Sequence, residues 1–406
     1  MQALDDIVVL DLSRVLAGPW ATQNLADLGA TVIKVEKPGE GDDTRRWGPP
    51  FLTDPETGEP GDAAYYLSAN RGKRSVTVDM ATPEGQEIIR ALAAKADVLV
   101  ENYKFGGLKK YGLDYASLSA LNPRLIYCSI TGFGQTGPYA PRAGYDFLIQ
   151  GMGGLMSITG ERDDLPGGGP QKAGVALADV MTGLYSTIAI LGALHQRARS
   201  GRGQYLDMAL LDVQVGTLAN QALFYLVGGK PPVRFGNGHP TVVPYQSFPT
   251  SDGFVIIAVG NDGQFGRLAE ELGHAEWAAD ERFKSPGARV VNRDALIPLI
   301  AAETAKRSMD DLILAMEKRG VPCGPINTVD KVFADPHVQA RQLRRDVPHG
   351  RMGSVPSVAS PLRLSDSPVS YDRGPPMLGE HTDEVLAEQL GFNADRLAGL
   401  RKRGVI

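Results

Sequence analysis

One stretch of the chain contains the residue best suited to covalent chemistry. The segment 174–185, GVALADVMTGLY, places a single acidic residue, Asp179, within a run of small and apolar side chains. Burying an unpaired carboxylate is costly, so an acid at this position either caps the helix that follows or is retained as a reactive group. The local pattern alone favours the helix cap.

The composition limits the classes of protein to consider. The 406 residues are long enough for two or three domains, and 43% hydrophobic against 22% charged residues is typical of a globular protein. A net charge of −5, with scattered Lys and Arg, provides no surface suited to nucleic acid or to an anionic membrane. Cys128 and Cys323 lie far apart and no CxxC or HExxH motif occurs, which disfavours disulfide scaffolds and metal sites.

The N-terminal residues are acidic where a signal peptide would carry Lys or Arg. No apolar run reaches about 18 residues without a polar interruption. These features and the two separate cysteines favour a reducing compartment, and we expect a cytoplasmic protein.

Short apolar runs alternate with helical patterns over the first 150 residues. Strands are predicted at Ile7–Leu12, Thr31–Val35, Val98–Glu101 and Leu125–Ser129, with a helix that starts at Pro83 between the second and third. This alternation predicts an open parallel α/β sheet. The first turn lacks GxGxxG, which argues against a nicotinamide oxidoreductase. Because ligands of such sheets bind beyond the carboxyl ends of the strands, ENYKFGG and TGFGQTGP are candidate binding loops.

The later pattern predicts a second domain. Helices are expected at Gly144–Thr159, Asp179–Arg197 and Leu211–Val227, and a strand at Tyr205–Leu210. The breaker GGKPP then marks a boundary. We predict a large domain whose first part is 1–230, a small α+β domain at 235–325, and a return segment at 326–406 that completes the large domain.

Eight short motifs, in the same order along the chain, resemble those of the class III CoA-transferases, the CaiB/BaiF family. They are the opening DLSRVLAGPWATQNLADLGATVIKVEKPGEGDDTR, NRGKRSVTVDM, VENY, TGFGQTGP, GYD, the Asp179 segment, VPCGPI and LGEHTDEVL. The resemblance spans nearly the whole chain. Within the family, DDTRRWGPPF and TVVPYQSF are most similar to the members that move CoA from succinyl-CoA to glutarate.

The resemblance implies a Rossmann-like large domain made from both chain ends and ring-shaped subunits that interlock as a homodimer. It makes Asp179 the nucleophile, and a carboxylate suits this role because its acyl adduct can be passed on to CoA or to an incoming acid. A helix N-terminus would hold that carboxylate in its ionised form. The substrates implied are an acyl-CoA and a carboxylic acid, with no tightly bound cofactor.

Family positions also imply a CoA site. It comprises Leu16, Ala17, Lys37, Val78, Asp79, Asn102, Tyr103, Lys110, Tyr145 and Asp146. Of these, Lys37 and Lys110 have the charge expected of phosphate partners. A relative, formyl-CoA transferase, has a catalytic Gln where this chain has Leu16, so an oxyanion donor must come from the backbone or from elsewhere. The basic cluster Arg71, Lys73 and Arg74 precedes the contact positions and is interpreted as a surface group.

A dicarboxylate acceptor requires a second cationic anchor. Arg46 and His239 are candidates, although a loop salt bridge and a turn residue satisfied by the backbone explain them equally well. Gly236 and Gly238 resemble the family's mobile loop over the nucleophile, and an interdomain hinge would have the same pattern.

Three alternatives stay open. A 2-methylacyl-CoA racemase on the same fold needs a His in a GHD triplet, where this chain has Gly144-Tyr145-Asp146, and tyrosine is a poor base at neutral pH. Transfer of CoA to another acid, such as carnitine, is a second alternative. A CoA-binding protein without turnover is the third, and the retained Asp179 argues against it.

Overall fold

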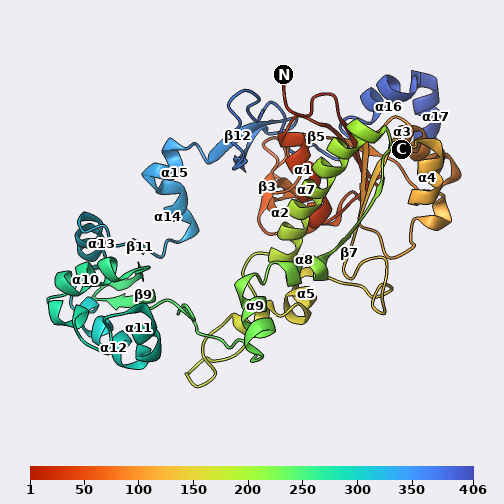
Figure 1. The fold of residues 1–406 in the computed structure, drawn as a ribbon. Helices are drawn as coiled ribbons and strands as arrows, with labels where there is room; N and C mark the ends of the chain where they lie inside the picture. Colours follow the sequence, from red (N-terminus) through yellow and green to blue (C-terminus); the bar gives the residue numbers. More distant parts are fainter. The chain divides into compact units, whose positions relative to one another are not determined.

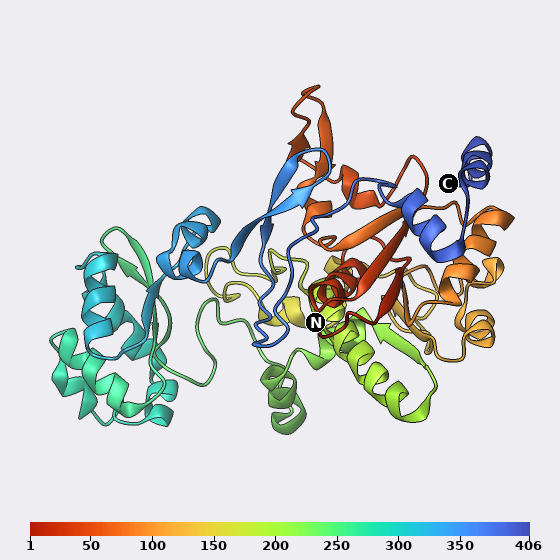
Figure 2. The same ribbon diagram turned by 90° about the horizontal axis from the view of Figure 1, so that it is seen from above.

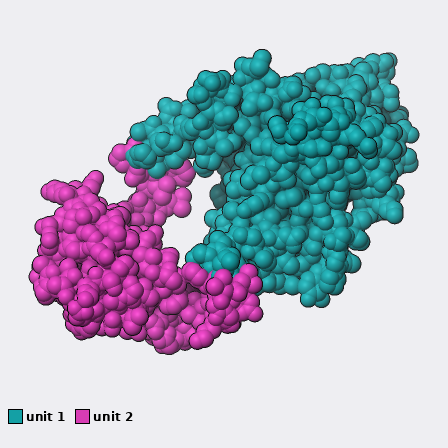
Figure 3. All heavy atoms as spheres, in the orientation of Figure 1, with its two compact units in different colours: residues 1–155, 173–223, 337–406 teal, residues 156–172, 224–336 magenta.

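The computed structural model describes residues 1–406 and divides into two compact units. Unit 1 comprises residues 1–155, 173–223 and 337–406, and unit 2 comprises 156–172 and 224–336 (Figure 3). Unit 1 is therefore built from both ends of the chain. The main difference from the predicted bounds is the segment 156–172, which belongs to unit 2.

A backbone and a side-chain hydrogen bond join this segment to other residues of unit 2. The Gly236 N–H donates to the Gly160 carbonyl at 3.1 Å, and Arg234 Nη1 donates to the Ser157 carbonyl at 3.0 Å. Such pairing between segments more than 70 residues apart leaves no local pattern in the sequence.

The centre of unit 1 is a six-stranded parallel sheet in the order β5-β2-β1-β6-β7-β8. Its strands are Val8–Asp11 (β1), Thr31–Glu36 (β2), Lys73–Thr77 (β5), Val98–Glu101 (β6), Ile126–Thr131 (β7) and Tyr205–Ala209 (β8). Both faces are covered, so successive residues such as Val9 and Leu10 enter two different hydrophobic clusters. The sequence predicts every strand of this sheet except β5, because two basic residues interrupt the apolar pattern there.

Helices cover the two faces of the sheet. One face carries α1 (Ala17–Asp27), α5 (Asp146–Met152), α7 (Leu177–Ser200) and α8 (Leu210–Gly216). The other carries α3 (Pro83–Ala93), α4 (Tyr115–Leu121), α16 (Thr382–Leu390) and α17 (Ala394–Lys402), so the C-terminal helices lie beside N-terminal ones (Figures 1 and 2). By length and composition α7 could cross a membrane, as could the bent pair of α8 and α9 taken together. In unit 1, α7 packs along α1, α5 and α8.

Two predicted helices are each broken in the structure. The expected helix at 144–159 divides into α5 and α6 (Leu155–Ile158), because Gly154 adopts a φ of +86° between them. The expected helix at 211–227 divides into α8 and α9 (Asn220–Gly228), where Ala219 has a φ of +49°. The remaining elements of unit 1 are η1 (Asp43–Arg46), β3 (Phe51–Thr53), β4 (Pro60–Ala63), α2 (Ala64–Leu67), η2 (Lys109–Tyr111), β12 (Arg344–His349) and β13 (Gly353–Val358).

Unit 2 has a three-stranded antiparallel sheet in the order β11-β10-β9, packed against helices around its own hydrophobic core. Its elements are β9 (Tyr245–Thr250), β10 (Gly253–Ala258), α10 (Asp262–Glu271), η3 (Ala275–Ala278), α11 (Pro286–Val291), α12 (Arg293–Thr304), α13 (Met309–Lys318), β11 (Cys323–Pro325) and α14 (Val329–Ala334). The short helix α15 (Pro336–Ala340) begins at the boundary with unit 1.

The basic cluster interpreted as a surface group is buried, which corrects that interpretation. Lys73 is fully buried, and Arg71 and Arg74 are less than one tenth exposed. Arg71 Nη2 bonds to Asp27 Oδ2 at 2.7 Å, and Lys73 Nζ lies 3.1 Å from Asp11 Oδ2. Arg74 bonds to two glutamates of α16 at 2.7 Å. These cations tie distant segments to the sheet, and their carboxylate partners cannot be identified from the local sequence.

Candidate active site

The larger of two cavities in unit 1 lies at the carboxyl edge of the parallel sheet. It has a volume of about 610 Å³, and its lining residues come mainly from the turns that follow β1, β2, β5, β6 and β7. This is the edge at which ligands of open parallel sheets bind. The predicted binding loop ENYKFGG contributes Asn102, Tyr103 and Lys104.

Most residues of the predicted CoA site line this cavity together with Asp179. They are Leu16, Ala17, Lys37, Val78, Asp79, Asn102, Tyr103, Lys110 and Tyr145. Asp146 does not line it. The cavity therefore brings together predicted site residues from positions 16 to 179 of the chain. Asp146 is the one predicted CoA-site residue outside its lining.

Several cations of the cavity were not singled out from the sequence. Arg14, Lys104 and Arg142 line it beside Lys37 and Lys110. Arg14 bonds to Asp43 at 2.8 Å, whereas Lys37 is exposed and pairs with Glu40 at 2.5 Å. Their position in the sequence could have identified two of them, because Arg14 and Lys104 each lie within three residues of the end of a strand. Cations gathered at this edge suit a ligand that carries phosphates.

A buried network shapes the loop that carries Leu16. The backbone of Val15 has a φ of +70°, which is strained for a β-branched residue. The Val15 N–H donates to both oxygens of Asp42, at 3.2 and 3.3 Å. Lys34 Nζ donates to Asp42 Oδ2 and to the Ser13 carbonyl, both at 2.9 Å. The fully buried Lys34–Asp42 pair therefore holds the strained loop in place at the cavity wall.

Asp179 is the third residue of α7 and does not cap it, so the local cap interpretation is wrong. The N-cap residue, Ala176, makes no side-chain cap hydrogen bond. Instead, Asp146 Oδ1 accepts from the N–H of Ala178 at 2.8 Å and from that of Asp179 at 3.3 Å. A residue from another helix thus supplies the cap.

The electrostatics of Asp179 also differ from expectation. Burial and the nearby charge of Asp146 raise the pKa of Asp179 to about 7. No donor within the chain bonds to its carboxylate, so nothing offsets these two effects. The predicted stabilisation of the ionised form by the helix N-terminus does not prevail. Both the protonated and the ionised form of Asp179 are therefore populated near neutral pH, and a pKa perturbed in this way is typical of reactive groups.

None of the residues predicted to bind the acceptor acid is among those that line this cavity. Arg46 is exposed in η1, and Gly236, Gly238 and His239 belong to unit 2. The His239 N–H donates to the Tyr245 carbonyl at 3.0 Å, and His239 Nδ1 accepts from the Thr241 N–H at 3.2 Å. Its backbone and ring are thus satisfied locally in a turn.

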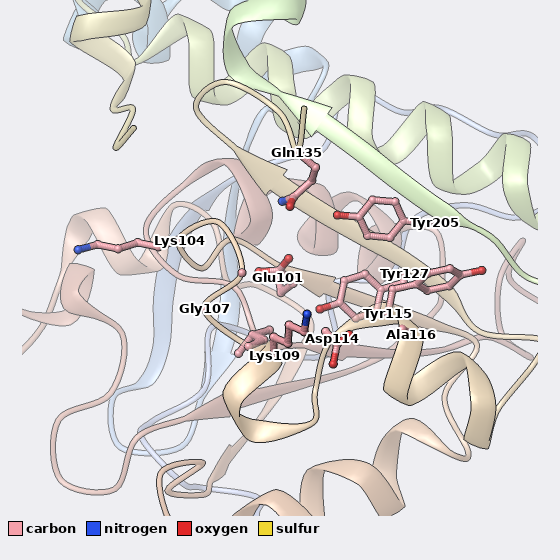
Figure 4. Close-up of a pocket in the computed structure, with 12 residues that line it drawn as sticks. Glu101, Lys104, Gly107, Lys109, Asp114, Tyr115, Ala116, Tyr127, Gln135 and Tyr205 are labelled. Atoms are coloured by element: carbon pink, nitrogen blue, oxygen red, sulfur yellow. The ribbon is translucent and has the colours of Figure 1, made fainter. Parts of the chain in front are cut away.

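A smaller cavity of about 210 Å³ is lined in part by the loop that follows β6 (Figure 4). It shares Lys104 and Gly107 with the larger cavity, and Glu101 stands among its lining side chains. Glu101 Oε2 accepts from the Tyr103 N–H at 2.8 Å. Burial raises the pKa of Glu101 to about 7, against the effect of hydrogen bonds from Ser129 and Tyr103. Glu101 therefore supports the loop that presents Asn102 and Tyr103.

Comparison with known proteins identifies the family of this chain. A family model described as CoA-transferase family III matches residues 4–382. The chain belongs to CoA-transferase family III. It is accordingly an enzyme of the transferase type. The structure has no group of three or more His, Cys, Asp or Glu side chains that could hold a metal ion.

Individual relatives of this CoA-transferase are similar over almost the whole chain. It is 56% identical over 385 residues to the succinate–glutarate CoA-transferase of Agrobacterium fabrum, with 95% of each chain covered. It is 42% identical over 406 residues to the succinyl-CoA:glutarate CoA-transferase of Homo sapiens, covering 100% of this chain and 90% of the human protein. A crystal structure of a CaiB/BaiF family protein from Brucella suis matches with a TM-score of 0.85 and 57% identity, covering 96% of this chain and 99% of that one.

Proposed function

We propose that the enzyme transfers CoA from succinyl-CoA to glutarate through a covalent adduct on Asp179. The observation that carries this proposal is the position of Asp179 in the same cavity as the residues predicted to bind CoA. The names of the relatives at 56% and 42% identity support the choice of donor and acceptor.

The first half-reaction uses the ionised form of Asp179. A carboxylate oxygen attacks the thioester carbonyl of succinyl-CoA, the C–S bond breaks, and CoA leaves as a thiolate. The product is a mixed anhydride between succinate and Asp179. The thiolate then attacks the Asp179 carbonyl carbon, succinate leaves as a carboxylate, and an aspartyl-CoA thioester is formed.

The second half-reaction reverses these steps with the acceptor. A carboxylate of glutarate attacks the aspartyl thioester, and the thiolate leaves again. The thiolate then attacks the glutaryl carbonyl of the new anhydride, which releases glutaryl-CoA and restores the Asp179 carboxylate. No redox change or external proton is required. The role of the cavity is to hold thioester and carboxylate in reacting geometry, which contributes roughly 7–11 kcal/mol in well-oriented systems.

A panel of acids tests the choice of substrates. Purified enzyme is incubated with succinyl-CoA and one acid at a time, including glutarate, carnitine and several other mono- and dicarboxylates. We expect glutaryl-CoA to form with the highest kcat/KM. A higher kcat/KM for another acid would replace glutarate in the proposal, and solvent deuterium at Cα of a branched acyl-CoA would favour a racemase instead.

The cavity lining makes a separate prediction about two adjacent lysines of η2. Lys110 lines the larger cavity and Lys109 does not. Since a charge-assisted hydrogen bond contributes about 1.5–3 kcal/mol, Lys110→Ala should raise KM for succinyl-CoA at least about tenfold with kcat little changed. Lys109→Ala is the matched control and should leave KM within about twofold of wild type in the same steady-state assay. Equal effects of the two changes would contradict CoA binding at this cavity.

The proposal includes the interlocked homodimer of ring-shaped subunits that the resemblance implies. Exposed apolar side chains gather on α5, α7 and α8 of unit 1, and Ile188 is 62% exposed. The others are Leu148, Met152, Leu184, Tyr185 and Val215. A surface of this kind suits a second copy of the chain. Sedimentation equilibrium should give twice the mass of the chain, and a monomer at micromolar concentration would contradict this part of the proposal.

Acceptor binding by Arg46, Gly236, Gly238 and His239 belongs to the same proposal. The exposed guanidinium of Arg46 is the best candidate to meet the second carboxylate of glutarate. A cytoplasmic location and the lack of a tightly bound cofactor stay predictions from the sequence.

A further inference from the structure

Two side chains of α5 bond to the chain segment that leads into Asp179. Asp146 accepts from the first turn of α7, as described above. One turn later on α5, Gln150 Oε1 accepts from the Ala173 N–H at 2.9 Å. Gln150 Nε2 donates to Asp146 Oδ2 at 2.7 Å and to the Val175 carbonyl at 3.4 Å. The two side chains therefore bond to each other and to both ends of segment 173–178.

We propose that Asp146 and Gln150 form a positioning clamp that sets the place and the charge state of Asp179. The clamp rests on the proposed role of Asp179 as the nucleophile. It assigns to Asp146 a role that differs from CoA contact, because Asp146 does not line the larger cavity.

The surroundings explain why this segment needs a clamp. Gly174 and Val175 are exposed, and a Cβ atom added at Gly174 would have no other atom within 4 Å. Packing therefore contributes little to holding the segment. Gln150 is fully buried, which makes its hydrogen bonds costly to lose. The clamp thus provides order that neither packing nor a local cap supplies.

The groups that face Asp179 determine the effect of the clamp on its charge. Asp146 faces it from α5, and its negative charge favours the protonated form of Asp179. Tyr65 faces it from α2, and burial together with the charges of Asp179, Asp146 and Asp42 raises the pKa of Tyr65 to about 12. Tyr65 is therefore neutral at the pH of an assay, and Asp146 is the neighbouring charge that a substitution can remove.

The first test compares two aspartates that accept backbone N–H groups. Asp146→Ala should lower kcat about 10²-fold with KM for succinyl-CoA within about threefold of wild type, because the nucleophile is displaced while the CoA cavity is unchanged. Asp207 accepts from the Gln135 N–H at 2.9 and 3.1 Å and lines neither cavity. Asp207→Ala is the matched control and should change both constants less than about threefold.

The second test exchanges the two side-chain types. In the double variant Asp146→Asn/Gln150→Glu, the introduced amide can accept from the Ala178 N–H and donate to the introduced carboxylate, which can in turn accept from the Ala173 N–H. Gln150→Glu alone places two carboxylates 2.7 Å apart and should lose more activity than the double variant. Rescue of kcat by the second substitution is an outcome that general destabilisation does not produce.

The third readout is the pH profile of kcat. Asp146→Asn retains an acceptor for α7 but lacks the charge, so the pKa of Asp179 should fall and the acid limb should move to lower pH. A kcat of Asp146→Ala within threefold of wild type, the absence of rescue, or an unmoved acid limb would each overturn the clamp. Formation of an adduct on Asp179 is measured in the wild-type enzyme in parallel. If the adduct forms but a clamp test fails, the clamp proposal alone is wrong. If no adduct forms, both the clamp and the role of Asp179 as nucleophile are wrong.

Discussion

Replacing Asp179 with Asn should lower kcat for CoA transfer by at least about 10⁴-fold. Without the nucleophile the covalent intermediate cannot form, which is a larger loss than that of a single stabilising contact. An amide has the same shape as the carboxylate but cannot form the anhydride. The measurement is steady-state formation of glutaryl-CoA from succinyl-CoA. The dissociation constant for succinyl-CoA, measured by calorimetry, should stay within about tenfold of wild type because the cavity is retained.

The stability of the same variant provides its control. The pKa of Asp179 is near 3.8 in the unfolded chain and about 7 in the folded enzyme. Between these values the folded state binds a proton that the unfolded state has lost, so the stability of the wild type falls as the pH rises toward 7. Asp179→Asn lacks this effect and should melt at a higher temperature than wild type at pH 8. A variant that is folded, more stable and inactive isolates the chemical role of the carboxylate, whereas transfer that survives in it would contradict that role.

The wild-type pH profile follows from the same pKa. Only the ionised carboxylate attacks the thioester, so kcat should rise with pH through about 7 and then level off. A profile that is flat from pH 5.5 to 8.5 would mean that Asp179 does not titrate in the reacting complex.

Replacing Lys73 with Met should lower the free energy of unfolding by about 3–5 kcal/mol, because it leaves the carboxylate of Asp11 buried without its nearest cation. Lys73 Nζ also donates to the Pro19 carbonyl at 3.0 Å and to Asn70 Oδ1 at 2.9 Å. Asp11 is fully buried, and although burial favours its neutral form, Lys73 and Lys34 hold its pKa below the usual value. Chemical denaturation followed by circular dichroism measures the effect.

An exposed lysine of the same unit is the control for this change. Lys37 pairs with Glu40 at the surface, so Lys37→Met should cost no more than about 1 kcal/mol. Adding Asp11→Asn to Lys73→Met should recover part of the lost stability, since the buried charge is then removed. If Lys73→Met unfolds within about 1 kcal/mol of wild type, the buried pair is not what ties β5 to β1.

The sequence predicts the parallel sheet well because its strands, such as Val98–Glu101, are buried on both faces and are therefore continuous apolar runs. It fails at β5, where Lys73 and Arg74 pair with carboxylates from β1 and α16. Charges that are neutralised by residues distant in the sequence look like surface charges when only neighbours are visible.

The site shows the same division. The turns after the strands could be identified as binding loops, since their position at the sheet edge follows from topology. The state of Asp179 could not, because it depends on Asp146, which lies 33 residues earlier and reaches α7 through the tertiary fold. Local helix rules favoured an ionised helix cap, whereas burial and the second carboxylate raise the pKa of Asp179 to about 7.

Trapping of the covalent intermediate tests the central claim most directly. The enzyme is incubated with succinyl-CoA, treated with hydroxylamine or borohydride, digested, and examined by mass spectrometry of the peptide that contains Asp179. The mechanism predicts that modification depends on succinyl-CoA, is confined to Asp179, and is absent from Asp179→Asn. Unmodified Asp179 in an enzyme that continues to transfer CoA would contradict it.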